Sequence, residues 1–284
     1  SAASDVYKRQ LYHAASATLN ELAKDAKYLG ANIGYICILH TWGSAMNYHP
    51  HIHTIVLGGG LDDENKWKET GGKFFLPYGV ISKVFRGKYL DELKSLWNDS
   101  KLKFHGTAEK YQNSYRFKEL LDKCYEKNWV TYCKETFNGA QSVINYLGKY
   151  THRIAISNHR IKSMTDTTVT YVVKDYKNEG CWKEKTISGE EFIRRFMMHV
   201  PPKRFVRIRH YGLLSCRNKR KKITHCRNLL GCKKYISTLK NLNAVEMIRV
   251  LYHIDVCKCS SCGGNMVSPR KDKYSSSFRA HKRC

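Results

Sequence analysis

The amino-acid sequence predicts an α+β fold built around an antiparallel sheet. Two apolar, β-branched segments, 33–40 and 51–59, are separated by a loop of about eight residues, and the second ends in glycines, which is the pattern of a hairpin. A second hairpin is predicted over 168–188, with the turn sequence "KNEG" between its strands. Helical segments lie between these hairpins without regular βαβ alternation, so a parallel, doubly wound sheet is not expected.

The first part of the chain is predicted to be helical. Apolar residues recur at helical spacing up to a stop at Gly30, at Leu11, Ala15, Leu19, Leu22 and Ala26. After the first hairpin, residues 62–79 are predicted to form a long connecting segment that contains a short strand at 74–76. Mixed three- and four-residue spacing then predicts helices over 81–98 and 108–126.

The second half begins with a helix running into a strand over 139–157. Ser188 and Glu191 have the spacing of a capping box, which predicts the start of a helix that ends before Pro201 and Pro202. A basic segment, 203–222, and a cysteine-rich tail from Cys257 complete the chain, and no internal repeat is visible.

The charge balance indicates a polyanionic partner. The chain of 284 residues has 50 Lys+Arg against 24 Asp+Glu, a formal net charge of +26. Such a field attracts nucleic acid, because each neutralised phosphate releases counterions, and it favours nucleic acid over a membrane surface. No apolar run reaches the ~18–20 residues of a membrane span, and no secretory signal is visible. The 11 cysteines, an odd number irregularly spaced, favour reduced thiols and a cytoplasmic protein.

Three histidines form a candidate metal site. His51 and His53 lie two apart on a predicted strand, so both side chains leave the same face while Ile52 points to the other. If the two strands pair, His40 at the end of the preceding strand supplies a third imidazole ligand. The alternative is a set of solvated polar residues, since among 13 histidines a His-x-His pair arises by chance about as often as not. His49 precedes a proline in the loop and is expected to be structural.

A tyrosine pair supplies candidate nucleophiles. Tyr146 and Tyr150 are four apart on a predicted helix and therefore neighbours on one face, and a phenol can attack a phosphodiester. Lys149 is placed to steady the charge on the phosphate. The same spacing occurs at Tyr111 and Tyr115, and packing on the core is the alternative for either pair.

Three blocks in a fixed order together resemble a known family. They are "LHTWGSAMNYHPHIHTIVLGGGL", "YLGKYTHRIAISNHRI" and "EFIRRFMMHVPPKRFVRIRHYGLLS", and the resemblance extends over residues 11–265. The sequence is similar to the two-tyrosine HUH transposases of the insertion-sequence ninety-one type. The family's histidine motif falls on His51 and His53, and its tyrosine pair falls on Tyr146 and Tyr150, which leaves Tyr111 and Tyr115 as structural candidates.

The resemblance implies an HUH-endonuclease, ferredoxin-like fold: a five-stranded antiparallel sheet with the motif histidines on a central strand and the tyrosine helix beside them. It implies Mg²⁺ or Mn²⁺ at the histidines and cleavage of single-stranded DNA at transposon ends and target sites through a 5′-phosphotyrosine. The expected segments are a nuclease core over 11–160, a basic accessory region over 161–250 and a cysteine-rich tail over 251–284. The rivals are a replication initiator or relaxase with the same chemistry, and a non-catalytic DNA-binding remnant.

Three further features complete the expectations. Cys259, Cys262, His281 and Cys284 either form a structural Zn²⁺ site or leave a lone Cys-x2-Cys pair. Phosphate contacts are expected from exposed basic residues in strand and loop segments, namely Arg153, Arg204, Arg207, Arg209, Arg217, Lys219, Arg220 and Lys221. Residues 1–10 do not resemble the family, and the family's usual N-terminal cysteine-rich region is not seen, so a fragment competent in chemistry but impaired in recognising DNA ends is expected.

Overall fold

The computed structural model describes residues 2–71, 76–134, 137, 139–151, 154–175, 178–232, 239 and 241–266. The backbone forms two compact units, Ser1–Gly231 and Cys232–Cys284. These units do not coincide with the expected segments 11–160, 161–250 and 251–284, whose functional division stays a prediction.

A four-stranded antiparallel sheet forms the centre of the first unit, with the strand order β3-β2-β1-β7 among the described residues. Its strands are β1 (Asn32–Trp42), β2 (Tyr48–Leu61), β3 (Trp67–Glu69) and β7 (Ile208–Gly212). The predicted first hairpin is confirmed by β1 and β2. The resemblance implied five strands, whereas this sheet has four among the described residues, and its short strand β3 lies at Trp67–Glu69. The strand expected at 74–76 falls on Phe74 and Phe75, which lie outside the described residues.

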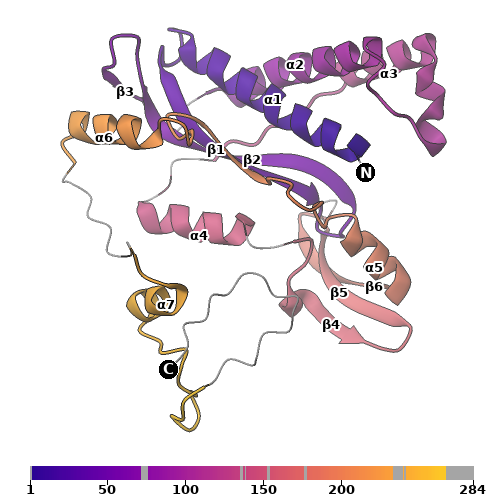
Figure 1. Cartoon of the computed structure of the whole chain (residues 1–284). Coiled ribbons are helices and arrows are strands. Elements are labelled where there is room, and N and C mark those ends of the chain that lie inside the picture. Colours follow the sequence, from indigo (N-terminus) through magenta and orange to yellow (C-terminus); the bar gives the residue numbers. More distant parts are fainter. Residues whose placement is uncertain are drawn as a thin grey trace. The chain divides into compact units, whose positions relative to one another are not determined.

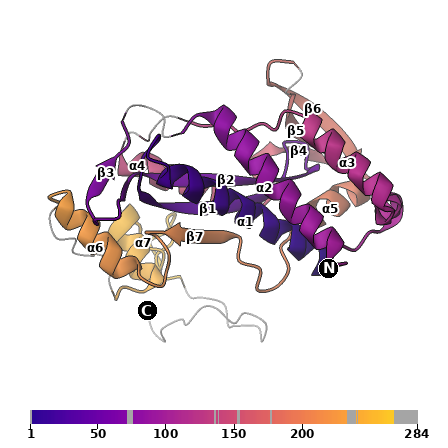
Figure 2. The same cartoon turned by 90° about the horizontal axis from the view of Figure 1, so that it is seen from above.

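Strand β7 joins this sheet from the basic segment late in the chain. It pairs antiparallel with β1, with Gly34 opposite Gly212 and Ile38 opposite Ile208 (Figure 2). Gly212 has a φ of 58°, and a Cβ at this position would come within 1.9 Å of the Ile33 carbonyl oxygen. Only glycine fits this close approach, so the end of β7 is fixed by the sequence.

Helices cover one face of the sheet. Helix α1 (Ala2–Lys24) and helix α2 (Tyr78–Asn98) pack on Tyr35, Cys37 and Leu39, which alternate along β1 (Figure 1). The predicted first helix is confirmed, although it ends at Lys24 and a turn carries the chain to Gly30. The predicted helix 108–126 is divided into a 3-10 helix, Gly106–Gln112, and α3 (Ser114–Glu126), which packs on α2.

The other face of the sheet carries helix α4 (Ala140–Thr151), the predicted tyrosine helix (Figure 1). The strand expected directly after it is wrong. Ala155 is buried with a left-handed φ of 55°, which interrupts an extended backbone, and the strand β4 (Ile161–Met164) forms only after a short 3-10 turn, Asn158–Arg160.

A second, three-stranded sheet has the order β4-β5-β6 and confirms the second predicted hairpin, with β5 (Thr168–Asp175) and β6 (Cys181–Ser188). Helix α5 (Gly189–Met197) follows directly. Ser188 accepts a hydrogen bond from the Glu191 N–H, but the Glu191 carboxylate binds Arg194 and Arg195, so only half of the expected capping box forms.

The basic stretch 217–222 was expected to be a loop, and this is wrong in part. Helix α6 (Lys219–Leu229) begins within it and buries Cys226 against Leu61 and Leu213. In the second unit, α7 (Ala244–Tyr252) begins with a capping box between Asn243 and Glu246. Within the described part of the chain, no helix combines the length and apolar character needed to cross a membrane.

Candidate active site

The three histidines predicted from the sequence converge on one side of the sheet. In the β1–β2 register His40 lies opposite His51, and Ile38 lies opposite His53, so all three side chains leave the face that carries α4. The Nε2 atoms of His51 and His53 are 3.1 Å apart. Among the described residues these three form the one group of metal-type donors whose ligand atoms lie within 4.8 Å of one another.

Hydrogen bonds fix the tautomers of two of these rings. A carbonyl oxygen only accepts, so His51 Nδ1 carries the proton donated to the His49 carbonyl at 2.8 Å, and its Nε2 keeps a lone pair. His40 Nε2 likewise donates to the Tyr150 carbonyl at 2.8 Å, which leaves a lone pair on Nδ1. The backbone thus orients both imidazoles, as outer hydrogen bonds do for metal-binding histidines.

Burial keeps these imidazoles neutral. Desolvation lowers the pKa of His40 to about 4 and that of His53 to about 3, and it lowers the pKa of His51 as well. Neutral rings offer lone pairs at physiological pH. The 3.1 Å between two Nε2 atoms suits two nitrogens that share one cation at about 2.1 Å. The donor set therefore fits a divalent cation, and imidazole nitrogens suit transition-metal ions better than Mg²⁺.

Helix α4 brings both predicted tyrosines to the histidines. Tyr146 Oη lies 3.0 Å from His53 Nδ1. The Tyr150 ring lies 4.3 Å from the His53 ring and 4.4 Å from the Tyr146 ring, measured between centroids. Burial, together with the neighbouring Tyr150, raises the pKa of Tyr146 to about 12. A phenol at this position is therefore protonated at neutral pH unless a neighbour stabilises its anion.

The second tyrosine pair lies elsewhere. Tyr111 belongs to a 3-10 helix and Tyr115 belongs to α3, and Asn113, the N-cap of α3, separates the two helices. The two tyrosines therefore do not lie on one face of a single helix. Tyr111 packs in the α2–α3 core cluster, and 72% of Tyr115 is exposed. Equal spacing in sequence therefore has different structural meanings at the two pairs.

The predicted phosphate-binding residues divide into two groups. Arg207 donates to the Thr151 carbonyl at the end of α4, and its guanidinium lies 5.8 Å from the Trp42 ring. Arg209 lies 4.2 Å over the Tyr12 ring. The remaining described residues of the set are exposed, namely Arg204, Arg217, Lys219, Arg220 and Lys221. The Arg153 residue and the Lys149 side chain lie outside what the structure describes.

The tail shows only part of its predicted zinc site. The Cys259 N–H donates to the Gly264 carbonyl, and the Gly263 N–H donates to the Cys259 carbonyl, which makes a tight loop. Hydrogen bonds from the backbone N–H groups of Ser261 and Cys262 lower the pKa of Cys259. His281 and Cys284 lie outside the described residues, so an intact Zn²⁺ site stays a prediction.

Several residues that organise the site were not predicted for that role. Trp42 stacks on His40, with 4.4 Å between ring centroids and 17° between planes. The loop 43–47, which joins the two histidine strands, is held by four residues that we call the loop clamp. Arg160 donates to the Ser44 carbonyl, Tyr171 and Arg195 donate to the Ala45 carbonyl, and His199 donates to the Met46 carbonyl, so the clamp is Arg160, Tyr171, Arg195 and His199.

No local pattern marks the clamp, because each contact joins positions more than 100 residues apart. His199 shows the precision of this attachment. Its Nε2 donates to the Met46 carbonyl and its Nδ1 accepts from the Thr41 hydroxyl, both at 3.1 Å. The second sheet and α5 thus position the turn between His40 and His51.

Comparison with known proteins identifies a family for this chain. Residues 34–222 match the family model described as "Putative transposase". The chain is 40% identical over 222 residues to putative transposase y4qJ of Sinorhizobium fredii, covering 78% of this chain and 56% of that protein. It is 27% identical over 245 residues to the transposase for insertion sequence element IS801 of Pseudomonas savastanoi pv. phaseolicola, covering 85% and 58%. The chain therefore spans little more than half the length of these relatives. No solved structure matches it significantly.

Proposed function

Because this chain belongs to the putative transposase family, we propose that it cuts and rejoins single-stranded DNA through a covalent phosphotyrosine, with His40, His51 and His53 as ligands of a divalent cation and Tyr146 as the first nucleophile. The chemistry is that of the two-tyrosine HUH enzymes that the sequence resembles.

One observation carries the proposal, namely the 3.0 Å contact between Tyr146 Oη and His53 Nδ1. A strand and a helix bring these residues together from distant parts of the chain. A buried tyrosine in a core is satisfied by any acceptor, but this one is paired with an imidazole whose other nitrogen faces a second imidazole. Such an arrangement links a candidate nucleophile directly to a candidate metal centre.

The proton positions favour attack by Tyr146. When Nε2 of His53 serves as a ligand, the single proton of the neutral ring sits on Nδ1, and Nδ1–H then donates to the Tyr146 oxygen. A donated hydrogen bond favours the phenolate, which opposes the burial that raises the pKa of this residue. A divalent cation bound by the three histidines would polarise the phosphate and stabilise its developing charge.

Cleavage forms the bond from Tyr146 oxygen to phosphorus and breaks the bond from phosphorus to the 3′ oxygen. The phenolic proton is in effect transferred to the leaving 3′ oxygen, so the products are a 5′-phosphotyrosine and a free 3′-hydroxyl. The bond energy stays in the phosphotyrosine, from which a 3′-hydroxyl can take the phosphate back.

Tyr150 is the proposed second nucleophile. It lies one helical turn from Tyr146 on the same face of α4, with its ring against His53. A second phenol beside the same centre permits a further cleavage while the first DNA end stays attached. Exposed cations, among them Arg204, Arg217 and Lys219, supply the sequence-independent attraction for the strand.

The experiment is formation of a covalent adduct. The protein is incubated with labelled single-stranded DNA carrying the ends of its own mobile element, with Mn²⁺ or with EDTA, and denatured products are separated by gel electrophoresis. A Mn²⁺-dependent band that carries both protein and label is expected. Protease digestion should then leave a label on a peptide containing Tyr146.

Three results would overturn the proposal in different ways. Binding of the DNA without any adduct, under all metals and with both ends, would leave a DNA-binding remnant. An adduct on another residue would retain the nuclease but refute the site. Cleavage of a plasmid origin or transfer origin, but not of element ends, would assign the same chemistry to a replication initiator or relaxase.

A further inference from the structure

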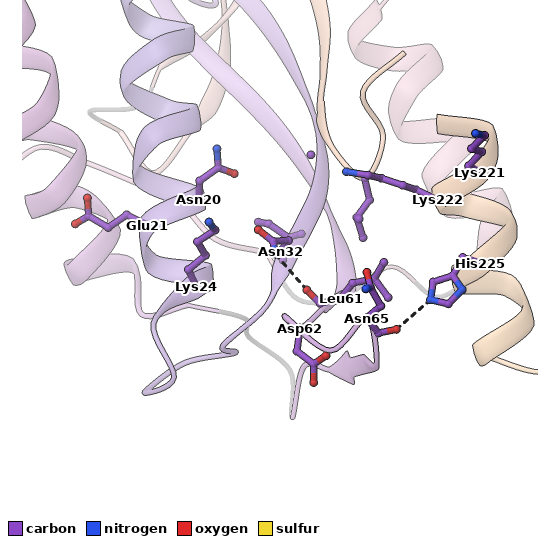
Figure 3. Close-up of a pocket in the computed structure, with 13 residues that line it drawn as sticks. Asn20, Glu21, Lys24, Asn32, Leu61, Asp62, Asn65, Lys221, Lys222 and His225 are labelled. Carbon is purple, nitrogen blue, oxygen red and sulfur yellow. Dashed lines mark hydrogen bonds between the residues drawn. The ribbon is translucent and has the colours of Figure 1, made fainter. Parts of the chain in front are cut away.

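A hollow of about 800 Å³ lies at the opposite end of the β1–β2 hairpin from the histidines. Its walls come from the end of α1, the start of β1, the turn after β2, and α6. Figure 3 shows Asn20 and Lys24 on α1 facing Lys222 and His225 on α6, with Asn32 and Asn65 between them. Its volume is in the range of small-molecule sites.

The charges around this hollow are unbalanced. Both carboxylates in its walls are engaged by lysines outside it, Glu21 with Lys88 at 2.5 Å and Asp62 with Lys68 at 4.0 Å. Within the described part of the chain, the three lysines of the hollow have no ion-pair partner, and they are Lys24, Lys221 and Lys222. Uncompensated cations facing one space repel each other, so an anion placed there is favoured.

Helix α6 reinforces this preference. Its first turn consists of four consecutive cations and has no acidic residue, and the N-cap Asn218 makes no side-chain capping bond. Cations at the positive end of a helix dipole are unfavourable, whereas a phosphate there is favourable. Lys221 and Lys222 belong to both the turn and the hollow, so the two observations meet at the same place.

The opposite wall offers groups that can recognise a base. The Asn20, Asn32 and Asn65 amides each carry a donor and an acceptor, as the edges of bases do. Asn20 Oδ1 accepts from the Tyr35 hydroxyl at 3.1 Å, which orients the amide and directs its NH₂ group away from that bond. Among the described residues, the Asn32 side chain makes only one long hydrogen bond, in which its Nδ2 donates to the Leu61 carbonyl at 3.5 Å.

We propose that this hollow binds one nucleotide of the single-stranded DNA substrate, with its phosphate at Lys222 and the start of α6 and its base at the asparagine amides. The proposal rests on the proposed function for the nature of the substrate. His40 lies seven positions after Ile33 along β1, which places it about 23 Å from the hollow. The α1 wall of the hollow and the histidines lie on opposite faces of the sheet, so this distance is the shortest path that the DNA can take. A stacked strand rises about 3.4 Å per nucleotide, so the bound nucleotide lies at least about seven positions from the cleaved phosphate.

The test measures binding without cleavage. The probe is a fluorescein-labelled 20-nucleotide DNA selected by the full chain from a random single-stranded pool, and anisotropy is recorded in EDTA. A set of probes with a single abasic site at each position then identifies the bases that contribute. The proteins are the full chain, Asn32→Ala and Lys222→Ala, with Asn98→Ala and Lys118→Ala as controls, because neither Asn98 on α2 nor Lys118 on α3 lines the hollow.

In the unmodified protein, one or two adjacent abasic positions should weaken binding about tenfold. In Asn32→Ala, an abasic site at those one or two positions should no longer weaken binding, whereas abasic sites at other positions should have the same effect as in the unmodified protein. Lys222→Ala should weaken the intact probe about tenfold and reduce the slope of log affinity against log salt by about one. The two controls should change affinity by less than twofold. Circular dichroism melts establish that each variant is folded.

The proposal is overturned if Asn32→Ala leaves the abasic profile unchanged, or if Lys118→Ala and Lys222→Ala weaken binding equally. If only the proposed function fails, the result is different. The abasic-site profile would still change in Asn32→Ala, but no covalent adduct would form in Mn²⁺. Binding of free deoxynucleotide monophosphates with the same affinity as the selected DNA would assign the hollow to a soluble nucleotide and also refute a DNA site.

Discussion

His53 and Tyr146 lie 93 positions apart in the sequence, and their Nδ1 and Oη atoms lie 3.0 Å apart in the structure. The contact joins strand β2 to helix α4 and places a phenol at the edge of a three-histidine cluster. Neither element alone brings a nucleophile and a set of ligands together. The predictions below test what this pairing and its supports contribute.

Removing one phenol should separate the two tyrosines by role. Tyr146→Phe should reduce adduct formation at least about a hundredfold, because the proposed nucleophile paired with His53 is lost. Tyr150→Phe should still form the first adduct but should not give the strand-transfer product. Gel assays with 5′- and 3′-labelled single strands measure both steps. The matched control is Tyr111→Phe combined with Tyr115→Phe, which should retain full activity, and a loss there would refute the choice of pair.

Removing one histidine should separate chemistry from binding. His51→Ala should abolish Mn²⁺-dependent cleavage and weaken Mn²⁺ binding measured by calorimetry, because one of the three proposed ligands is lost. DNA affinity should fall less than threefold, since it arises from spread positive charge. His49→Ala is the control: the bond from His51 goes to the His49 backbone carbonyl, which alanine keeps. If DNA affinity in His51→Ala fell as much as cleavage does, His51 would have a structural role.

Arg207 should act through the position of α4. Its guanidinium donates to the Thr151 carbonyl and lies against Trp42, which stacks on His40. Arg207→Met keeps the aliphatic stem but removes the donor, and we expect a loss of about 1–3 kcal/mol in stability. The cleavage rate should fall about tenfold with little change in DNA affinity, and rapid-quench kinetics can measure this. A loss of affinity without a loss of rate would instead assign Arg207 to phosphate contact.

Stability should depend on pH through His199. Burial lowers the pKa of this side chain, whereas in the unfolded chain it is about 6.5. Below about pH 6.5 the unfolded chain binds the proton first, so stability is full above that pH and falls as the pH decreases toward the lowered value. Urea midpoints at pH 7.5 and 5.5 should differ less in His199→Gln than in the unmodified protein. His159→Gln, on an exposed turn, should leave the difference unchanged.

Two glycines should respond oppositely to alanine. At Gly212 a Cβ would meet the Ile33 carbonyl oxygen in a backbone with positive φ, so Gly212→Ala should cost about 3 kcal/mol or more. Gly87 lies inside α2 with no atom within 4 Å of an added Cβ, so Gly87→Ala should stabilise the chain by about 0.5–1 kcal/mol. Thermal melts measure both changes. A neutral Gly212→Ala would show that β7 is not held as described.

Local patterns predicted the elements whose formation depends on neighbouring residues. The β1–β2 hairpin, helix α2 and the β5–β6 hairpin each have periodicity or turn residues within their own span. The position of His40 opposite His51 followed from the hairpin alone. The tyrosine helix was predicted by spacing, but its choice over Tyr111 and Tyr115 came from the resemblance, since spacing does not show that Asn113 begins a new helix there.

Other features depend on distant contacts. Nothing in the segment around Arg207 shows that β7 will pair with β1 rather than form a separate basic strand. The strand expected after α4 fails because Ala155 turns inward beside Tyr171, a residue of another sheet. The basic stretch at Lys219 was expected to be a loop that contacts phosphates or is flexible. Its consecutive cations disfavour the start of a helix, but helix α6 forms there and packs Cys226 against Leu213.

During synthesis, the β1–β2 hairpin can form before the loop clamp and β7, which hold it in place, have been made. Strands β1 and β2 are complete once Leu61 has been made, but their connecting turn and outer edge wait for His199 and Gly212 of a 284-residue chain. A ribosome that stops before Gly212 therefore releases a hairpin with an unpaired edge and an unsupported turn. The contacts that hold the three imidazoles in place form only when most of the polypeptide has been made, so interrupted translation leaves the histidine cluster unorganised.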